Sequence, residues 1–171
     1  DRANRLTEQL LTLARLDPMQ ALPDAQPIDW QRTAHQTLQS VNLQAREKRV
    51  QLKLECACGF GQVFPPLGNE VLLQLMLRNL LDNAIRYSPP NSHVTLTLAA
   101  NGLSVCDEGP GIAAEHLPRI RERFYRPPGQ SQQGSGLGLS IVERIADLHG
   151  LRLDLANADE RGLCVHMIKA V

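Results

Sequence analysis

The sequence has no apolar run long enough to cross a membrane. Its longest apolar stretch, Val71 to Leu81, is interrupted by three polar residues, whereas a membrane-spanning helix needs roughly 18 or more consecutive apolar residues. The chain begins at Asp1 without an initiator Met and without the charged and then apolar layout of a signal peptide. We therefore expect a piece that is not embedded in a membrane, cut from a natural protein that continues upstream.

The sequence also has no excess charge of either sign. Its 171 residues contain 18 Lys and Arg against 18 Asp and Glu. A protein that binds a polyanion usually carries a basic surface, so this balance predicts no nucleic-acid partner. The length suits one domain with a core and a short appendage, and it is short for two full domains.

Cysteine and histidine are present without the spacing of a zinc site. The four cysteines are Cys56, Cys58, Cys106 and Cys164, and the five histidines are scattered. Structural zinc sites use paired Cys-x-x-Cys or Cys and His sets, which are missing here. We expect four reduced thiols, as in a cytosolic protein, and no metal site built from these residues.

Leucines recur every three or four residues at the start of the chain, at Leu6, Leu10, Leu13 and Leu16. This spacing predicts a helix with one apolar stripe over residues 1–17. Three prolines among polar residues then indicate a linker over residues 18–27. The globular domain is expected to cover residues 28–171.

Within that domain, periodicity predicts three helices and five strands. The helices are expected over residues 30–48, 69–87 and 136–149, and the strands over 50–54, 94–98, 103–107, 151–155 and 163–167. Asn101-Gly102 predicts a hairpin turn. The predicted class is α+β, a two-layer α/β sandwich in which three helices cover one face of a mixed, mostly antiparallel sheet. Residues 112–134 form a long weakly periodic segment, which is usually functional or disordered.

Asn79 and Asn83 lie four residues apart, so both amides project from one face of the second predicted helix, and Arg86 and Tyr87 continue that face. Burying an amide without a partner costs about 1 to 3 kcal/mol. These side chains therefore face either water or a polar ligand. An amide oxygen would suit Mg²⁺ whose charge is already largely matched by phosphates.

Asp107-Glu108-Gly109-Pro110-Gly111 directly follows a predicted strand. The composition is that of a plain turn. Alternatively, Asp107 accepts a hydrogen bond from the exocyclic amine of adenine and the glycines let the ring approach. A carboxylate there would reject guanine, which presents an acceptor at that position.

Gly134-Ser135-Gly136-Leu137-Gly138-Leu139-Ser140 opens the third predicted helix. Bare N–H groups and the positive end of the helix dipole hold phosphates at such a position. The segment lacks the Gly-Lys-Ser/Thr ending of a P-loop, and the strand-turn-helix order of a dinucleotide fold is absent.

In this order, the three segments resemble the nitrogen box and the two glycine boxes of the ATPase superfamily that joins gyrase, Hsp90, histidine kinases and MutL. Residues 119–126 resemble the phenylalanine box of sensor histidine kinases. The run over residues 122–130 is most similar to the quorum-sensing branch of these kinases, and residues 1–17 resemble the end of a second dimerisation helix.

The resemblance implies ATP and Mg²⁺ as cofactors and assigns a role to each matching residue. Asn83 would bind the metal with Asn79 assisting, and Arg86 and Arg126 would contact phosphate. The implied catalytic residues are therefore Asn79, Asn83, Arg86 and Arg126. The implied nucleotide-binding residues are Asn79, Asn83, Arg86, Tyr87, Asp107, Gly109, Gly111, Ile112, Ser135, Gly136, Leu137, Gly138 and Leu139. Residues 124–134 would form a lid.

The resemblance also implies transfer of the γ-phosphate of Mg-ATP to a histidine on a dimerisation domain, and relay to an aspartate of a response regulator. None of the five histidines here has the sequence context of that acceptor. The partners implied are the protein's own dimerisation domain, in a homodimer, and a receiver domain. The expected location is the cytoplasmic side of a bacterial inner membrane.

Two other functions fit parts of the sequence. One is an ATP-hydrolysing conformational module of the gyrase or Hsp90 type, and the other is a nucleotide-free interaction module. In the hydrolytic relatives a glutamate that activates water stands where this chain has Asn79, and an amide cannot take a proton. Asn79 and the phenylalanine box therefore argue against hydrolysis.

Overall fold

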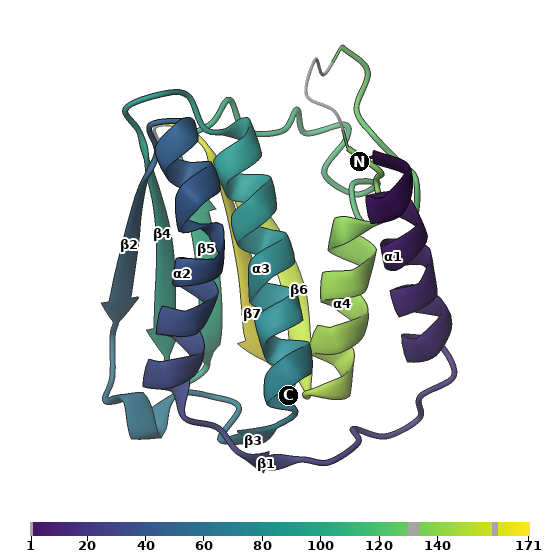
Figure 1. Cartoon of the computed structure of the whole chain (residues 1–171), viewed down its shortest axis with the longest axis vertical. Helices are drawn as coiled ribbons and strands as arrows, with labels where there is room; N and C mark the ends of the chain where they lie inside the picture. Colours follow the sequence, from purple (N-terminus) through teal and green to yellow (C-terminus); the bar gives the residue numbers. More distant parts are fainter. Residues whose placement is uncertain (1, 130–133, 159–160) are drawn as a thin grey trace.

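The computed structural model describes residues 2–129, 134–158 and 161–171. The described part contains four α-helices, a short 3₁₀ helix (Phe60–Gln62) and a five-stranded sheet, with a two-stranded ribbon at one end (Figure 1). The helices are α1 (Arg2–Leu16), α2 (Trp30–Glu47), α3 (Glu70–Tyr87) and α4 (Gly138–Leu148). The sheet strands are β2 (Gln51–Cys56), β4 (His93–Ala99), β5 (Gly102–Asp107), β6 (Leu151–Asn157) and β7 (Leu163–Lys169). The ribbon pairs β1 (Gln26–Pro27) with β3 (Leu67–Gly68).

The sheet has the strand order β2-β4-β5-β7-β6. Only β2 and β4 run parallel, and the other neighbours are antiparallel. Helices α2, α3 and α4 cover one face (Figure 1). This arrangement confirms the predicted two-layer α+β sandwich with a mixed, mostly antiparallel sheet.

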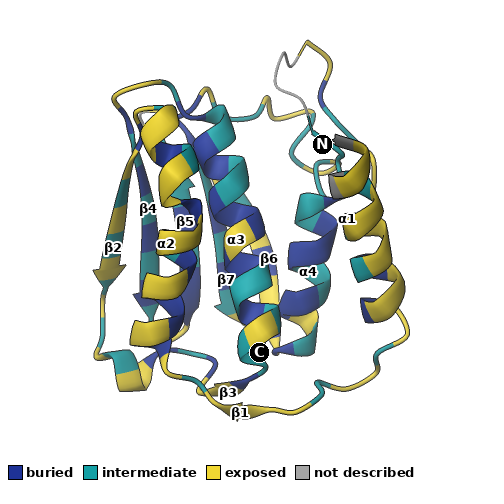
Figure 2. Ribbon diagram, viewed as in Figure 1, coloured by how far each residue is buried: buried dark blue, intermediate teal, exposed yellow. Residues whose placement is uncertain are grey.

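The core lies between that sheet face and the three helices. Strand β4 shows the cause, because Val94, Leu96 and Leu98 alternate with threonines and all three are fully buried. The helices are buried on the sides that face the sheet and exposed on the outer side (Figure 2). None of the described helices combines the length and the apolarity required to span a membrane.

Helix α3 runs through the centre of the helical layer and carries part of the predicted site. Its N-cap is Asn69, whose side chain accepts a hydrogen bond from Leu72 N at 3.1 Å. The helix ends before Pro89 and Pro90, and the Ser88 hydroxyl donates to Ala84 O at 2.7 Å. The end of α3 is therefore fixed locally by sequence.

Helix α1 packs on α4 rather than on the sheet (Figure 1). Its Leu13 and Leu16 are buried, whereas Leu10 is 42% exposed. The Arg144 guanidinium of α4 donates to Leu16 O at 3.1 Å and Asp17 O at 3.3 Å, and it also contacts Met19 O. A cation at this helix end stabilises unpaired carbonyls and the helix dipole.

The prediction of four reduced thiols is wrong for one pair of cysteines. Cys106 and Cys164 lie directly opposite each other on β5 and β7, with Cα atoms 4.1 Å apart, and form a disulfide. Their separation of 58 residues in sequence gave no hint of this pairing, which depends on strand register. Cys56 and Cys58 are free thiols.

Two boundaries also differ from the expectation. The β4–β5 hairpin is present, but Ala99 pairs with Gly102, so its turn lies one residue earlier than Asn101-Gly102. Helix α4 begins at Gly138, two residues after the predicted start, because the backbone at Gly136 has a φ of 74° and cannot be helical there.

Candidate functional site

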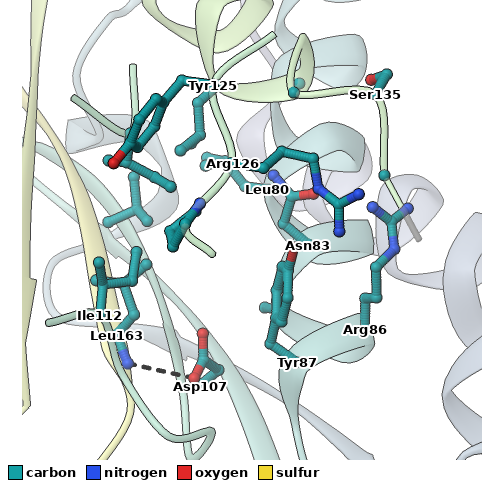
Figure 3. Close-up of a pocket in the computed structure, with 18 of the residues that line it drawn as sticks. Leu80, Asn83, Arg86, Tyr87, Asp107, Ile112, Tyr125, Arg126, Ser135 and Leu163 are labelled. Carbon is teal, nitrogen blue, oxygen red and sulfur yellow. Dashed lines mark hydrogen bonds between the residues drawn. The ribbon is translucent and has the colours of Figure 1, made fainter. Parts of the chain in front are cut away.

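A cavity of about 500 Å³ lies between α3, the start of α4, the end of β5 and the segment before α4 (Figure 3). Its volume is in the range of pockets that enclose a small molecule. Eleven of the residues singled out from sequence line it. They are Asn83, Arg86, Tyr87, Asp107, Gly111, Ile112, Arg126, Ser135, Gly136, Gly138 and Leu139. Three do not, namely Asn79, Gly109 and Leu137.

Asp107 ends strand β5 and lies at one side of the cavity, next to Ile112 and Leu163 (Figure 3). It is 9% exposed, and its Oδ1 accepts hydrogen bonds from Gly109 N at 2.8 Å and Leu163 N at 3.2 Å. Among the described residues no hydrogen bond reaches the second carboxylate oxygen. Asp107 therefore has a fixed orientation and one acceptor left for a ligand.

Burial raises the pKa of the Asp107 carboxyl, because desolvation disfavours the charged form. The hydrogen bonds from the two backbone amides act in the opposite direction. The geometry is suited to a carboxylate that accepts from an N–H group of a ligand, since both amide donors already hold the same oxygen.

The other side of the cavity is basic. Arg86, from the last turn of α3, and Arg126 extend toward the segment that carries Ser135 (Figure 3). A Cβ placed on Gly134 would lie 3.2 Å from Arg86 Nη1 and 3.8 Å from Arg126 Nε. Both guanidinium groups thus lie next to Gly134, and their positive charge makes this side of the cavity suited to an anion.

Asn83 lies between these two sides, where α3 meets the start of α4 (Figure 3). A Cβ on Gly138 would be 3.3 Å from Asn83 Nδ2 and 3.5 Å from Asn79 Oδ1. Any larger residue at position 138 would press on these amides. Ser135 Oγ accepts from Leu137 N at 3.2 Å, which shapes the turn that leads into α4.

Asn79 is buried beside the cavity rather than in its wall. It is 8% exposed, and its Nδ2 donates to Leu75 O at 2.9 Å, within its own helix. One turn of helix thus separates Asn83, which lines the cavity, from Asn79, which does not.

The segment over residues 113–129 lines part of the cavity and makes exposed ion pairs with other parts of the chain. Arg121 pairs with Glu143 of α4 at 3.2 Å, and Arg123 pairs with Asp17 at 2.6 Å. Phe124 has a φ of 65° and is 59% exposed. Residues 130–133, which belong to the predicted lid, lie outside the described residues.

Tyr125 lines the cavity and is fixed from within the same segment (Figure 3). Its hydroxyl lies 2.6 Å from His116 Nδ1, and the Arg119 guanidinium lies 4.2 Å from its ring centroid. From sequence, Tyr125 belonged to the phenylalanine box and to the expected lid, and it was not expected to line the pocket.

Two residues at the end of β6 and the start of β7 were missed from sequence. Asn157 donates from Nδ2 to Ile112 O at 2.7 Å and accepts at Oδ1 from Ile112 N at 2.8 Å. Gly162 has a φ of 102°, and a Cβ there would lie 1.8 Å from Asp107 O. Both hold the cavity wall across more than 40 residues of sequence, so local patterns could not reveal them.

Residues 6 and 9 of helix α1 also reach the cavity. Leu6 and Gln9 are among its lining residues, and Gln9 Oε1 accepts a hydrogen bond from Ser135 Oγ at 2.6 Å. No sequence signal linked this helix to the glycine-rich segment.

The family model and the individual relatives that match this chain point to the same protein family. The family model described as histidine kinase-, DNA gyrase B-, and HSP90-like ATPase matches residues 68–170. Sensor protein QseC of Escherichia coli K12 is 46% identical over 162 residues, which is 95% of this chain and 35% of that protein. Sensor protein kinase PmrB of Pseudomonas aeruginosa is 37% identical over 154 residues, 87% of this chain and 31% of that protein. The chain thus spans about a third of the length of these relatives.

The structural comparison agrees. The structure of the cytoplasmic segment of histidine kinase QseC matches with a TM-score of 0.67 and 34% identity, over 98% of this chain and 92% of that one.

Proposed function

The chain belongs to the family of histidine kinase-, DNA gyrase B- and HSP90-like ATPases, and we propose that it is the ATP-binding kinase domain of a two-component sensor histidine kinase. In this proposal it transfers the γ-phosphate of Mg-ATP to a histidine on a dimerisation domain. The likeness to QseC agrees with the resemblance to quorum-sensing kinases seen in residues 122–130.

One observation carries the proposal. A single cavity joins a buried acceptor, Asp107, at one side to two guanidinium groups, Arg86 and Arg126, at the other. A nucleotide has the same polarity, with an amine donor on adenine and negative charge on its phosphates. The roles assigned to these residues rest on this complementarity.

The side chains support transfer rather than hydrolysis. Of the cavity-lining residues that the structure describes, Asp107 alone carries a carboxylate, and two backbone amides hold it on the adenine side. Asn79 is an amide whose Nδ2 donates to its own helix. Among the described lining residues, no carboxylate is therefore available on the side of Arg86 and Arg126 to activate water, whereas an imidazole acceptor is itself the nucleophile.

We assign the metal to Asn83. Among the described residues, no group of three or more His, Cys, Asp or Glu is arranged to hold a metal ion. A magnesium ion would therefore take most ligands from phosphates and water, with one amide oxygen from the protein, which suits its chemistry. When bound, it neutralises charge on the phosphates. Arg86, Arg126 and the N-terminus of α4 supply the remaining neutralisation and positioning.

The partners follow from the same proposal. They are the dimerisation domain of the full protein, which would form a homodimer, and the receiver domain of a response regulator. Residues 1–17 would be the end of a dimerisation helix and residues 28–171 the catalytic domain. The full protein would act at the cytoplasmic side of a bacterial inner membrane.

The test is reconstitution of the transfer. The chain is mixed with γ-labelled Mg-ATP and a separately prepared dimerisation domain that contains its phosphoacceptor histidine. We expect acid-labile, base-stable label on that domain, and none when the histidine is replaced by glutamine. ATP binding without transfer, accompanied by steady release of phosphate, would instead identify a hydrolytic module.

A further inference from the structure

The end of helix α3 has carbonyl groups for which the following backbone supplies no helical N–H donor. In a continuing helix the N–H groups of residues 89 and 90 would donate to Ile85 O and Arg86 O. These residues are Pro89 and Pro90, which have no N–H group. The N–H and the hydroxyl of Ser88 both donate to Ala84 O.

Lys48 supplies the missing donors. Its ammonium group, at the C-cap of α2, donates to Ile85 O at 3.1 Å and Ser88 O at 3.2 Å, and it also contacts Arg86 O. Burial lowers the pKa of Lys48, and the nearby Arg86 charge acts in the same direction. Three carbonyls at the negative end of the helix dipole favour the ammonium group and hold it at this helix end.

That helix end is also a wall of the cavity. Arg86 and Tyr87 lie within the turn that Lys48 caps, and Asn83 lies one turn earlier. The Tyr87 carbonyl also abuts the loop after β5, since a Cβ on Gly109 would be 2.7 Å from Tyr87 O. A change in the last turn of α3 would therefore move the guanidinium on the basic side of the cavity.

We infer that Lys48 is a positioning residue for the phosphate side of the nucleotide site, acting through Arg86. This inference rests on the proposed function, because it requires Arg86 to contact phosphate. Lys48 itself does not line the cavity, so it acts by fixing the backbone of residues 85–88. The Asp107 wall is held by its own hydrogen bonds from Gly109 N and Leu163 N, so we expect it to depend much less on this cap than Arg86 does.

The experiment compares two ligands and a cycle of variants. Lys48→Met keeps the length of the side chain and removes the donors, and Arg86→Met removes the phosphate contact. Affinities for a non-hydrolysable ATP analogue and for adenosine are measured by calorimetry for each variant and for the double variant. Lys53→Met, at an exposed position of β2, is the matched control.

We expect Lys48→Met to weaken the triphosphate analogue about tenfold, since small displacements of a positioned group have large effects, and to leave adenosine within about twofold. In the Arg86→Met background the same substitution should change triphosphate affinity by less than about twofold. Equal loss for both ligands, no loss, or the same tenfold loss in both backgrounds would overturn the inference.

Two further results separate failure of the proposed phosphate site, or of folding, from failure of the Lys48 inference. If Arg86→Met itself has no selective effect on the triphosphate, the proposed phosphate site is wrong, and this is distinct from failure of the Lys48 inference alone. If Lys48→Met does not fold, Lys48→Gln, which keeps two N–H donors without the charge, is judged by the same comparison. Carbonyl chemical shifts of Ile85 and Arg86 then report whether the cap is lost.

Discussion

Replacement of Asp107 by asparagine gives the sharpest test of the adenine assignment. The amide oxygen of Asn can keep the bonds from Gly109 N and Leu163 N, which both use Oδ1 at 2.8 and 3.2 Å. The second oxygen then becomes an NH₂ group, a donor that faces the amine of adenine. Loss of a hydrogen bond to a charged acceptor costs about 1.5 to 3 kcal/mol, or roughly 10- to 150-fold in affinity.

The assay is calorimetric titration of the wild type and Asp107→Asn with ATP and ITP analogues. ITP presents an oxygen where ATP has the amine, so the wild type should prefer ATP and the variant should lose or reverse that preference. Unfolding curves check that the fold is retained. Unchanged affinity for ATP, or an equal loss for both nucleotides, would refute the assignment of this carboxylate to adenine.

The same assignment fixes the pH dependence of binding. Because burial raises the pKa of Asp107 above its ordinary value of 3.8, protonation begins at a higher pH than for an exposed aspartate. ATP affinity should fall as pH falls through that raised pKa, and Asp107→Asn should not show this loss. The stability of the nucleotide-free protein depends on this group in the opposite direction. Because the folded state has the higher carboxyl pKa, protonation of Asp107 favours folding, and its contribution to the free energy of unfolding rises as pH falls.

Four other outcomes follow from the structure. Asn83→Ala should abolish the Mg²⁺ dependence of nucleotide binding, and retained dependence in calorimetry with and without the ion would move the metal site elsewhere. Asn157→Ala should weaken adenosine and ATP analogues alike by about fivefold, from two lost bonds to Ile112; a loss confined to the triphosphate would contradict this. Reduction of the Cys106–Cys164 disulfide, which joins residues 58 apart in sequence, should lower the free energy of unfolding by about 4 kcal/mol. Denaturation curves that coincide with and without reductant would contradict this. Burial lowers the pKa of His149 below 6.5, so its contribution to stability should be present above pH 6.5 and lost as pH falls below it, a dependence that His149→Gln should remove from denaturation curves.

Local pattern was sufficient for the elements that carry the site. The apolar spacing of α3 and the two prolines after it predicted that helix, and the alternation in β4 and β5 placed Asp107 at a strand end. Glycines at the start of the third predicted helix indicated a phosphate-binding helix N-terminus, whereas the close approach of Gly138 to Asn83 of α3 came only from the structure. The predicted features depend on residues within one turn or one strand.

What sequence could not supply depends on contacts between distant segments. Asn157 and Lys48 act through hydrogen bonds that span 45 and 37 residues. Cys106 and Cys164 meet only because of the register between β5 and β7. The position of Asn79 depends on its hydrogen bond to Leu75 O, which turns the amide toward its own helix.

The two sides of the cavity are held with different strength, and salt should affect them differently. On the Asp107 side, the wall is fixed by hydrogen bonds from Gly109, Leu163 and Asn157 that belong to the sheet and its connections. On the phosphate side, the segment over residues 113–129 is fastened by the pairs Arg121–Glu143 and Arg123–Asp17, whose side chains are all more than a third exposed. Such pairs contribute about 0 to 1 kcal/mol each and weaken with salt. The backbone hydrogen bond from Phe124 N to Gly136 O at 3.0 Å is then the contact that ties this segment to the glycine-rich turn before α4, so raised salt should loosen the two ion pairs and leave that contact and the Asp107 wall in place.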